Sequence, residues 1–530
     1  MKRLRFALLA AAAAALLFAA PLAAAEKDTL VFSWSSILGD MNPHMYLPNQ
    51  PFGQAMIFEP LVRYGDDGTI QPCLAESWEI SDDGKTYVFR LRKGVLFSDG
   101  EPWNANAAKK NFDAIMGNAK RHAWMGFTDQ YESTSIMDEH TLKLTLKNAY
   151  YPALHDLSTI RPFRFLSPAA FPADGDTSKG IIKGVGTGPW IRVETKKGEY
   201  DLFARNDLYW GKKPAFKQVL VKTIPENESR VIALETGEID LICGASGQGA
   251  AQISIEAFKR LEASGRFTTA VSGPSATRAV AINSGRGATA DIAVRKAIQH
   301  AVDKDLLISA VFQNVEKRAD FLFDPRFPYC DADLIPYMLD RALAEKLLDD
   351  AGWKKSAESE YRSKNGEELV VELCFIGNDP LAKTVAEVLQ SDLRKIGMKL
   401  VLIGEENDSI WKRQKDGEFG MVFNDTWGAP FEPHAMIASM LLPSHADYQA
   451  QSGLPMKTEL DDAIRSVLLT TDEETRRGMY RDILGTLHDQ AVYLCLTYKT
   501  MLKVHSPKLD GVDFTPIVMV VPFERMHWKE

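Results

Sequence analysis

The pattern that most constrains the fold is a strand, a helix and a second strand in the later half of the chain. The run "LVVELCF" at 369–375 is apolar and of strand length, and it follows the turn residues Asn365 and Gly366. The segment 380–397, "PLAKTVAEVLQSDLRKIG", places apolar residues at helical spacing and ends in glycine. "KLVLIG" at 399–404 follows directly. Two strands joined through a helix pair in parallel, so this unit predicts an α/β fold.

Other elements carry their own start and stop signals. In "GKTYVFRLRKGV" (84–95) every second residue is apolar, which predicts a strand with one buried face. Capping residues predict four helices: 105–117 after Asn104, 292–312 after Asp291, 341–351 between Asp340 and Gly352, and 472–489 with a capping box of Thr471 and Glu474. The N-terminal third is rich in strands and the rest alternates strand and helix. A chain of 530 residues exceeds a single core, so we expect two α/β lobes with a cleft between them.

The first 25 residues predict a secretory signal peptide. Lys2, Arg3 and Arg5 precede an apolar run that is too short to span a membrane, and an Ala-x-Ala site stands before Glu26. No cysteine lies there to carry a lipid anchor. We therefore expect a periplasmic protein. Removal of the three cations takes the formal net charge from −9 to −12, which argues against nucleic acid and anionic membranes as partners.

Motifs for catalysis are missing from the sequence. It holds neither GxSxG nor GxxxxGK[ST], and the glycine-rich "GVGTGPW" (184–190) is followed by no helix, so it predicts a backbone turn. The segment "GASGQGAA" (244–251) predicts a flexible loop. The five cysteines are odd in number and widely spaced, which predicts no disulfide framework: Cys73, Cys243, Cys330, Cys374 and Cys495. Cys374 and Cys495 lie in apolar runs typical of strands, where a core role is expected. We expect a protein that is not an enzyme.

Ten histidines are present, and no two of them have the HxH or HxxxH spacing of a ready metal pair. One of them, His445, lies within "SMLLPSHADYQAQSG" (439–453), which its composition predicts to be a loop. A metal bound here must gather ligands from distant segments or arrive with ligands of its own.

Several stretches resemble the extracytoplasmic solute-binding proteins of the dipeptide/oligopeptide/nickel ABC importers. They include 57–105, "GTGPW" (186–190), "NDLYWGKKPA" (206–215), "LETGEIDL" (234–241), "VRKAIQHAVDKDLL" (294–307) and "LLDDAGW" (347–353). The resemblance implies a large two-lobed clamp that closes over its ligand. It places the larger, discontinuous first lobe at 26–270 plus 499–530 and the second at 271–498. It also implies delivery of the ligand to a membrane ABC permease by a monomer.

Within the family, the resemblance is strongest to the nickel-binding members. It is carried by "MNPHMYLPNQ" (41–50), "KRHAWMG" (120–126), "AYYPALHDL" (149–157), "RPFRF" (161–165), "LIGEENDSIWKRQKDGEFGM" (402–421), "TWGAPFEPHA" (426–435) and "PSHADYQAQSGL" (443–454). In those members a small organic chelator surrounds the metal, one protein histidine coordinates it, and arginines and aromatic residues hold the chelator. Matched by position, the histidine is His445, the arginines are Arg121 and Arg161, and the tryptophans are Trp124 and Trp427.

The chemistry of nickel agrees with this division. Ni(II) prefers sets of nitrogen and oxygen ligands that a single imidazole cannot complete, so a chelator such as L-histidine must supply the others. Arginine suits the carboxylates of such a chelator because its guanidinium forms a bidentate fork. The alternatives are structural ion pairs for the arginines, core packing for the tryptophans and an idle, solvated histidine. The roles of His44, His122 and His434 are not assigned by the pattern.

Four positions depart from the nickel-binding pattern: Pro51 stands for a methionine, Trp411 and Phe431 for tyrosines, and Met519 for a threonine. Trp411, Phe431 and Met519 are still expected to line the site. The changes leave open which chelator is bound, and whether the metal is carried as a nickel, cobalt or iron complex or as haem.

Peptide binding is the main rival function. Peptide-binding members carry an aspartate that pairs with the peptide ammonium, and Pro430 stands at that position here, so the counter-charge is missing. A secreted hydrolase and a sensor or chaperone are the remaining rivals.

Overall fold

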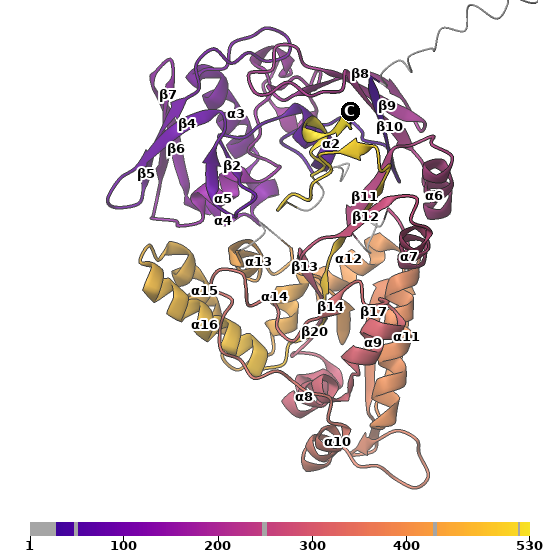
Figure 1. Ribbon diagram of the computed structural model, residues 1–530. Coiled ribbons are helices and arrows are strands. Elements are labelled where there is room, and N and C mark those ends of the chain that lie inside the picture. Colours follow the sequence, from indigo (N-terminus) through magenta and orange to yellow (C-terminus); the bar gives the residue numbers. More distant parts are fainter. Residues whose placement is uncertain (1–27, 47–50, 246–251, 428–431, 518–519, 530) are drawn as a thin grey trace, which may run out of the picture.

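The structure is a computed structural model that describes residues 28–46, 51–245, 252–427, 432–517 and 520–529. Two bodies of mixed helix and strand lie one above the other in Figure 1. The upper body holds a seven-stranded sheet and a four-stranded antiparallel sheet, and the lower body is built on a six-stranded sheet. The expected two-lobed α/β architecture is therefore present.

The upper body contains most of the first half of the chain. The seven-stranded sheet has the order β12-β21-β11-β1-β10-β9-β8, with strands β1 (Thr29–Trp34), β8 (Trp190–Lys196), β9 (Tyr200–Arg205), β10 (Gln218–Thr223), β11 (Leu241–Ala245), β12 (Thr268–Val271) and β21 (Met501–His505). The four-stranded sheet contains β4 (Ala75–Ile80), β5 (Thr86–Leu91), β6 (Tyr131–Asp138) and β7 (Thr141–Leu146), and a ribbon pairs β2 (Val62–Tyr64) with β3 (Ile70–Pro72). The helices are α2 (Pro51–Ile57), α3 (Ala105–Gly117), α4 (Gly126–Gln130), α5 (Ala153–Ser158), α6 (Asn227–Glu235) and α7 (Ile255–Ser264).

The lower body surrounds the sheet β14-β20-β13-β19-β17-β18. Its strands are β13 (Ala276–Ile282), β14 (Lys317–Arg318), β17 (Val370–Ile376), β18 (Lys399–Glu405), β19 (Met421–Phe423) and β20 (Tyr493–Lys499), beside a ribbon of β15 (Ser363–Lys364) and β16 (Glu367–Glu368). Its helices are α8 (Ile292–Ala301), α9 (Lys304–Ala310), α10 (Arg341–Asp350), α11 (Pro380–Lys395), α12 (Asn407–Asp416), α13 (His434–Ser439), α14 (Ala446–Gln451), α15 (Lys457–Leu469) and α16 (Glu473–Asp489).

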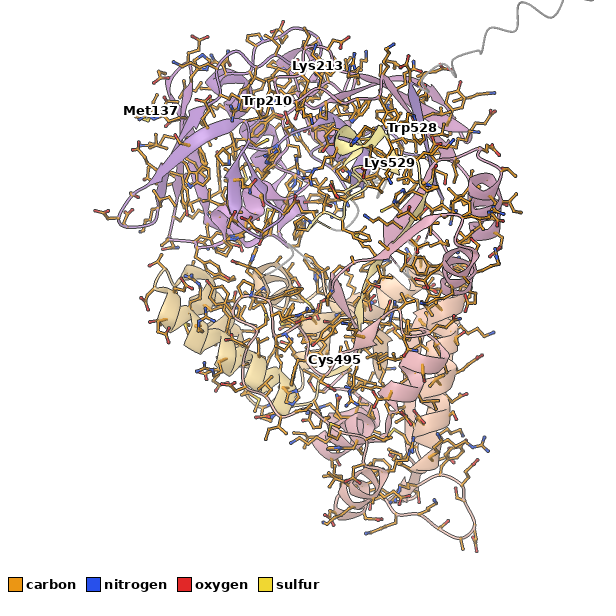
Figure 2. All side chains as sticks on the ribbon, viewed as in Figure 1. Met137, Trp210, Lys213, Cys495, Trp528 and Lys529 are labelled. Atoms are coloured by element: carbon orange, nitrogen blue, oxygen red, sulfur yellow. The ribbon has the colours of Figure 1, made fainter. Side chains whose placement is uncertain are left out.

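The chain passes between the bodies twice, from β12 to β13 and from β20 back to β21. A single residue, Thr500, separates β20 from β21. The end of the chain lies in the upper body, where Figure 2 labels Trp528. There β22 (Leu509–Asp510) pairs with β23 (His527–Trp528), and the Trp528 ring centroid lies 5.6 Å from that of Phe216. The lobe boundaries given above remain a prediction. The structure adds that both crossings are short.

The strand–helix–strand prediction is confirmed. β17 and β18 pair in parallel from Val370 with Lys399 to Ile376 with Glu405, and α11 joins them. The turn before β17 places Asn365 at φ 55° and the following glycine at φ 85°, a left-handed pair typical of a two-residue hairpin. The predicted strand within 84–95 is β5, and its alternate residues are buried as expected. Helices α3 and α10 begin at the predicted caps, Asn104 and Asp340.

Two helix predictions are corrected. The predicted helix 292–312 is two helices, because Val302 is extended and Asp303 caps a new helix by accepting a hydrogen bond from the Leu306 amide at 2.9 Å. The cap of α16 is not Thr471. Asp472 accepts from the Thr475 amide at 2.8 Å, and aspartate is the stronger N-cap residue.

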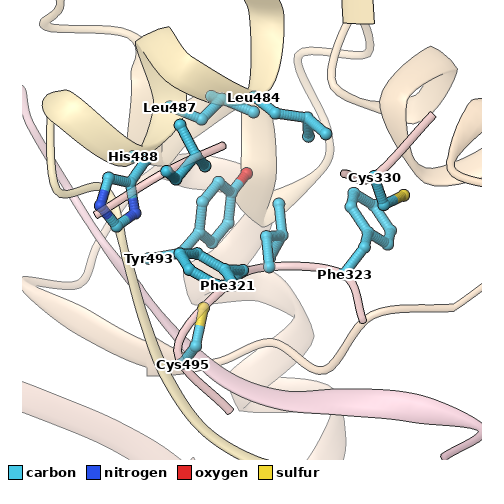
Figure 3. A pocket seen from close by; sticks show the side chains of 10 residues that line it. Phe321, Phe323, Cys330, Leu484, Leu487, His488, Tyr493 and Cys495 are labelled. Atoms are coloured by element: carbon cyan, nitrogen blue, oxygen red, sulfur yellow. The ribbon is translucent and has the colours of Figure 1, made fainter. Parts of the chain in front are cut away.

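The interior of the lower body encloses a small apolar cavity. It has a volume of about 20 Å³ and lies between the 321–334 segment, α16 and β20, with Phe321, Leu487, His488, Tyr493 and Cys495 among its lining residues (Figure 3). That volume holds about one water molecule, so the cavity is no ligand pocket. All five cysteines are free and buried, which confirms the core role expected for Cys374 and Cys495. Across the described ranges, no helix has the length and apolar character needed to cross a membrane.

The segment "GVGTGPW" is a close backbone contact rather than a simple turn. A Cβ added to Gly186 would lie 2.1 Å from the Ile57 carbonyl oxygen, and one added to Gly188 would lie 2.6 Å from the Met56 carbonyl oxygen. Only glycine lets these backbones approach, which explains its use here without any phosphate. The loop predicted at 244–251 lies outside the described residues, apart from the end of β11.

Candidate functional site

His445 lies at the start of a helix and not within a plain loop. The structure ends α13 at Ser439 and begins α14 at Ala446, so the predicted loop 439–453 is only partly correct. The His445 backbone is extended, its amide donates to the Leu442 carbonyl at 2.9 Å, and its carbonyl accepts from the Gln449 amide at 3.2 Å. The start of the helix therefore fixes the direction from which the imidazole leaves the chain.

Helix α14 is anchored from below by Asp447. This buried carboxylate accepts hydrogen bonds from the Tyr493 hydroxyl at 2.8 Å and from the Asn424 side-chain amide at 2.7 Å. Burial raises the pKa of Asp447 to about 6, although both hydrogen bonds oppose that shift. The network ties the residue two positions after His445 to β20 and to the end of β19.

The His445 imidazole is half-buried and open to a ligand. Its ring centroid lies 6.4 Å from that of Trp427, and within the described parts of the chain no side chain hydrogen-bonds its ring nitrogens. Burial lowers its pKa, so the ring is neutral at pH 7. A neutral imidazole with a free nitrogen is the form that coordinates a transition metal.

A line of aromatic rings leads from His445 into the upper body. The Trp427 ring meets Trp124 edge to face at 5.4 Å, and Trp124 meets Tyr46 in the same way at 5.9 Å. The Trp124 indole N–H donates to the Tyr46 hydroxyl at 2.9 Å, and that hydroxyl also lies 2.6 Å from Nδ1 of His122. Trp124 and Trp427 belong to different bodies, so this ring contact crosses the boundary between them.

Two arginines flank Tyr46 at the far end of this line. The guanidinium carbons of Arg121 and Arg161 lie 4.7 and 5.1 Å from the Tyr46 ring centroid. Arg161 also donates to the Tyr46 carbonyl at 3.0 Å, whereas Arg121 is exposed and makes no ion pair with any carboxylate in the described ranges. Burial, with a smaller contribution from Arg121, lowers the pKa of Arg161 to about 10. Two like charges on one ring create a positive region that favours an anion.

The neighbouring histidines are structural. His44 is buried, with Nδ1 2.9 Å from the Thr177 hydroxyl and Nε2 3.0 Å from Asn111 Oδ1. Burial lowers the pKa of His44 and of His122 to about 4, so both are neutral and hold the Tyr46 segment in place. Within the described residues, no group of three or more His, Cys, Asp or Glu side chains is arranged to hold a metal. A metal site here would use one protein ligand and others brought by the chelator.

Within the residues it describes, the structure does not join the remaining predicted residues to this group. Trp411 is 64% exposed on α12, where its indole donates to Asn407 at 3.2 Å, and no ring contact in the described structure joins it to the other site residues. Pro51 is the buried first residue of α2. Phe431 and Met519 lie outside the described residues, so their place at the site stays a prediction.

Comparison with known proteins identifies the family of this chain. Residues 69–448 match the family model described as "Bacterial extracellular solute-binding proteins, family 5 Middle". This match covers well over half of the chain. The protein belongs to this family of solute-binding receptors.

Individual relatives extend the match to almost the full length. The chain is 44% identical over 526 residues to the nickel-binding periplasmic protein of Escherichia coli (strain K12), which covers 99% of this chain and 98% of that protein. The crystal structure of NikA from Brucella suis in complex with Fe(III)-EDTA is 49% identical, superposes with a TM-score of 0.92, and covers 94% of this chain and 100% of that one. NikZ from Campylobacter jejuni in complex with Ni(L-His), at 23% identity and a TM-score of 0.78 over 94% of this chain and 99% of that one, shows the shared fold.

Sequence reasoning missed Tyr46. It lies in the quoted stretch 41–50, but a lone tyrosine gives no sign that two arginines, a tryptophan and a histidine converge on it. The available signal was that the stretches 41–50, 120–126 and 161–165 all resemble the nickel-binding members, and the fold brings residues from these three stretches together.

Proposed function

We propose that this protein captures Ni(II) as a complex with a small chelator that carries carboxylates, such as L-histidine, and delivers it to a membrane ABC permease. The supporting observation is the order of groups along the boundary between the bodies. At one end of this chain of contacts stands an imidazole whose ring nitrogens make no hydrogen bond within the described residues. Tryptophans from both bodies follow, and two arginines stand at the other end.

Each group has a distinct task in this proposal. His445 supplies one nitrogen to the metal, and the chelator supplies the other donors. Arg121 and Arg161 receive the carboxylates of the chelator, which relieves their mutual repulsion. Trp124 and Trp427 pack on the flat chelate and exclude water. Since the tryptophans belong to different bodies, a ligand that contacts both of them favours the closed form, and the permease recognises that form.

The proposal extends to location and assembly. Residues 1–25 act as the signal peptide, the mature protein works in the periplasm, and it does so as a monomer. The similarity to the nickel-binding periplasmic protein of Escherichia coli supports this location and this cargo.

Calorimetric titration of the apo protein tests the assignment. Wild type should bind Ni(II) tightly only when L-histidine is in excess. His445→Ala should weaken binding at least about 100-fold, because loss of a direct ligand exceeds the effect of removing an outer partner. The matched control is His300→Ala. His300 bonds to the Met338 carbonyl at 2.8 Å in the lower body and should leave binding unchanged.

Other outcomes redirect the function. Wild-type affinity in His445→Ala would refute the metal-ligand assignment. Binding of Co(II)–histidine, Fe(III)-EDTA or haem in place of Ni(II)–histidine would keep the site and change the cargo. If titration with a mixture of dipeptides released heat of binding and titration with every metal complex released none, the peptide-binding alternative would be favoured.

A further inference from the structure

A second cluster of ionisable side chains joins the two bodies away from the ring line. His155 and Asp156 belong to α5 of the upper body, and Glu432 and His434 lie at the start of α13 in the lower body. Nε2 of His434 lies 3.1 Å from Oδ1 of Asp156, and Nε2 of His155 lies 3.2 Å from Oε1 of Glu432. Both contacts therefore cross the boundary. Asp156 and His434 are fully buried and the other two side chains nearly so.

Asp156 is held rigidly in the upper body. Its Oδ2 accepts hydrogen bonds from the Tyr150 hydroxyl at 2.9 Å and from the Phe127 amide at 3.2 Å. Its other oxygen is thereby presented to the lower body. His434 also lies close to the second carboxylate: its Nδ1 is 3.5 Å from Oε2 of Glu432, although neither atom makes a hydrogen bond within the described residues.

Aromatic side chains enclose the cluster. The Tyr151 ring lies 6.3 Å from that of His434, the Tyr64 ring lies 5.7 Å from that of His155, and the two imidazoles are 5.6 Å apart. The groups that face His434 are thus Asp156, Glu432, His155 and Tyr151. Behind Tyr151 stand the Arg476 guanidinium, 4.1 Å from its ring, and the Tyr480 hydroxyl, 2.6 Å from its own.

The protonation state of His434 depends on contact between the bodies. Burial by itself would lower the pKa of His434, but Asp156 and Glu432 outweigh that effect and raise it to about 9. Burial would raise the pKa of Glu432, and the two histidines outweigh it and lower the pKa to about 2. Separation of the bodies would expose both groups to water and return their pKa values toward 6.5 and 4.5.

We propose that His155, Asp156, Glu432 and His434 form an ionic latch that holds the two bodies closed when His434 is protonated, and that therefore releases them as the pH rises. The proposal rests on the proposed function for its ligand, but the latch itself needs only closure. His434 is a positioning residue, because it acts on the distance between Trp124 and Trp427 without touching the ligand.

The sign follows from linkage. A group whose pKa is higher in the closed form contributes fully to closure below its open-state pKa, near 6.5, and loses that contribution as pH rises through about 9. The pKa of Glu432 is lower in the closed form, so its contribution holds above about 4.5 and fades as pH falls toward 2. The latch is therefore complete between about pH 4.5 and 6.5, and it weakens on the alkaline side.

The test measures dissociation of Ni(II)–histidine at pH 6, 7, 8 and 9, together with the radius of gyration of the apo protein in solution. Wild type should release the complex about tenfold faster, or more, at pH 9 than at pH 6. His434→Gln keeps a hydrogen bond to Asp156 but cannot be charged, and its release rate should not change over this range. The matched control His488→Gln, whose ring bonds to the Ile335 carbonyl within the lower body, should keep the wild-type profile.

A wild-type pH profile in His434→Gln would overturn the latch and leave nickel binding intact. Should His434→Gln fail to fold, Glu432→Gln takes its place. Glu432→Gln removes one of the carboxylates that raise the pKa of His434. The pH at which the release rate is half-way between its acid and alkaline values must therefore fall, and an unchanged value would refute the proposal. If wild type binds no Ni(II)–histidine at any pH, the radius of gyration decides: expansion between pH 6 and 9 that His434→Gln abolishes would keep the latch and reject only the proposed cargo, and a constant radius would reject the latch as well.

Discussion

Replacement of Arg161 by methionine should separate ligand binding from folding. The pKa of Arg161 lies at about 10 instead of 12.5, because the group is largely buried and faces the like charge of Arg121. Such a shift corresponds to about 3 kcal/mol against the charged form at most, before screening by solvent reduces it. A bound carboxylate would favour the charged form of Arg161 and so offset part of this cost.

The expected changes in stability and in affinity follow from the cost of burying the Arg161 charge. Loss of Arg161 removes its hydrogen bond to the Tyr46 carbonyl but also removes the repulsion with Arg121, so the melting temperature of the apo protein should change by only a few degrees. Charge-assisted hydrogen bonds to a carboxylate contribute about 1.5–3 kcal/mol, so the affinity for Ni(II)–histidine should fall roughly 10- to 150-fold. A 100-fold loss of affinity removes about 2.7 kcal/mol of ligand-induced stabilisation.

Thermal unfolding with and without Ni(II)–histidine measures both quantities. The matched control is Arg92→Met, since the Arg92 guanidinium also stacks on an aromatic ring, 4.3 Å from that of Trp210, and also donates to a backbone carbonyl. The control should keep the full ligand-induced shift. The reasoning is wrong if Arg161→Met retains that shift.

Two further results are expected. Tyr46→Phe should lower the free energy of unfolding by about 1–3 kcal/mol, because it leaves the indole N–H of Trp124 and Nδ1 of His122 without their partner. Denaturant titration of the apo protein measures this, and unchanged stability would contradict it. Binding of Ni(II)–histidine should also weaken in acid, as pH falls through the lowered pKa of His445, since coordination requires the neutral imidazole. Calorimetry at successively lower pH, within the range in which the protein stays folded, tests this, and constant affinity throughout would remove His445 from the metal.

The expected loss of metal binding in acid and the expected loss of closure in alkali come from two different histidines. His445 must be neutral to bind a metal, whereas His434 must be protonated to hold the bodies together. One protein can satisfy both near pH 6–7 because the two imidazoles have different neighbours. His445 is half-buried with no carboxylate beside it among the described residues, while His434 lies between Asp156 and Glu432.

Local sequence predicted the elements that carry clear signals of their own. The spacing of apolar residues and the turn residues were sufficient to predict β17, α11 and β18, because two buried strands joined by a helix can pair in few ways other than in parallel. They failed where two local signals competed. Asp303 divided a helix that apolar spacing made continuous, and Asp472 replaced Thr471 as a cap. Composition also missed α14, since a helix of six residues has too few turns to show a period.

The sequence by itself determined the residue types of the candidate site, through short motifs that resemble a known family. It could not determine that Tyr46 receives both arginines, or that Trp124 meets Trp427, because those residues lie far apart along the chain and in different bodies. It also could not assign His434, since a histidine acquires a raised or a lowered pKa only from the groups that the fold packs against it. Tertiary structure decided that carboxylates from both bodies surround the His434 imidazole. It also decided that none of the described residues hydrogen-bonds to the His445 ring.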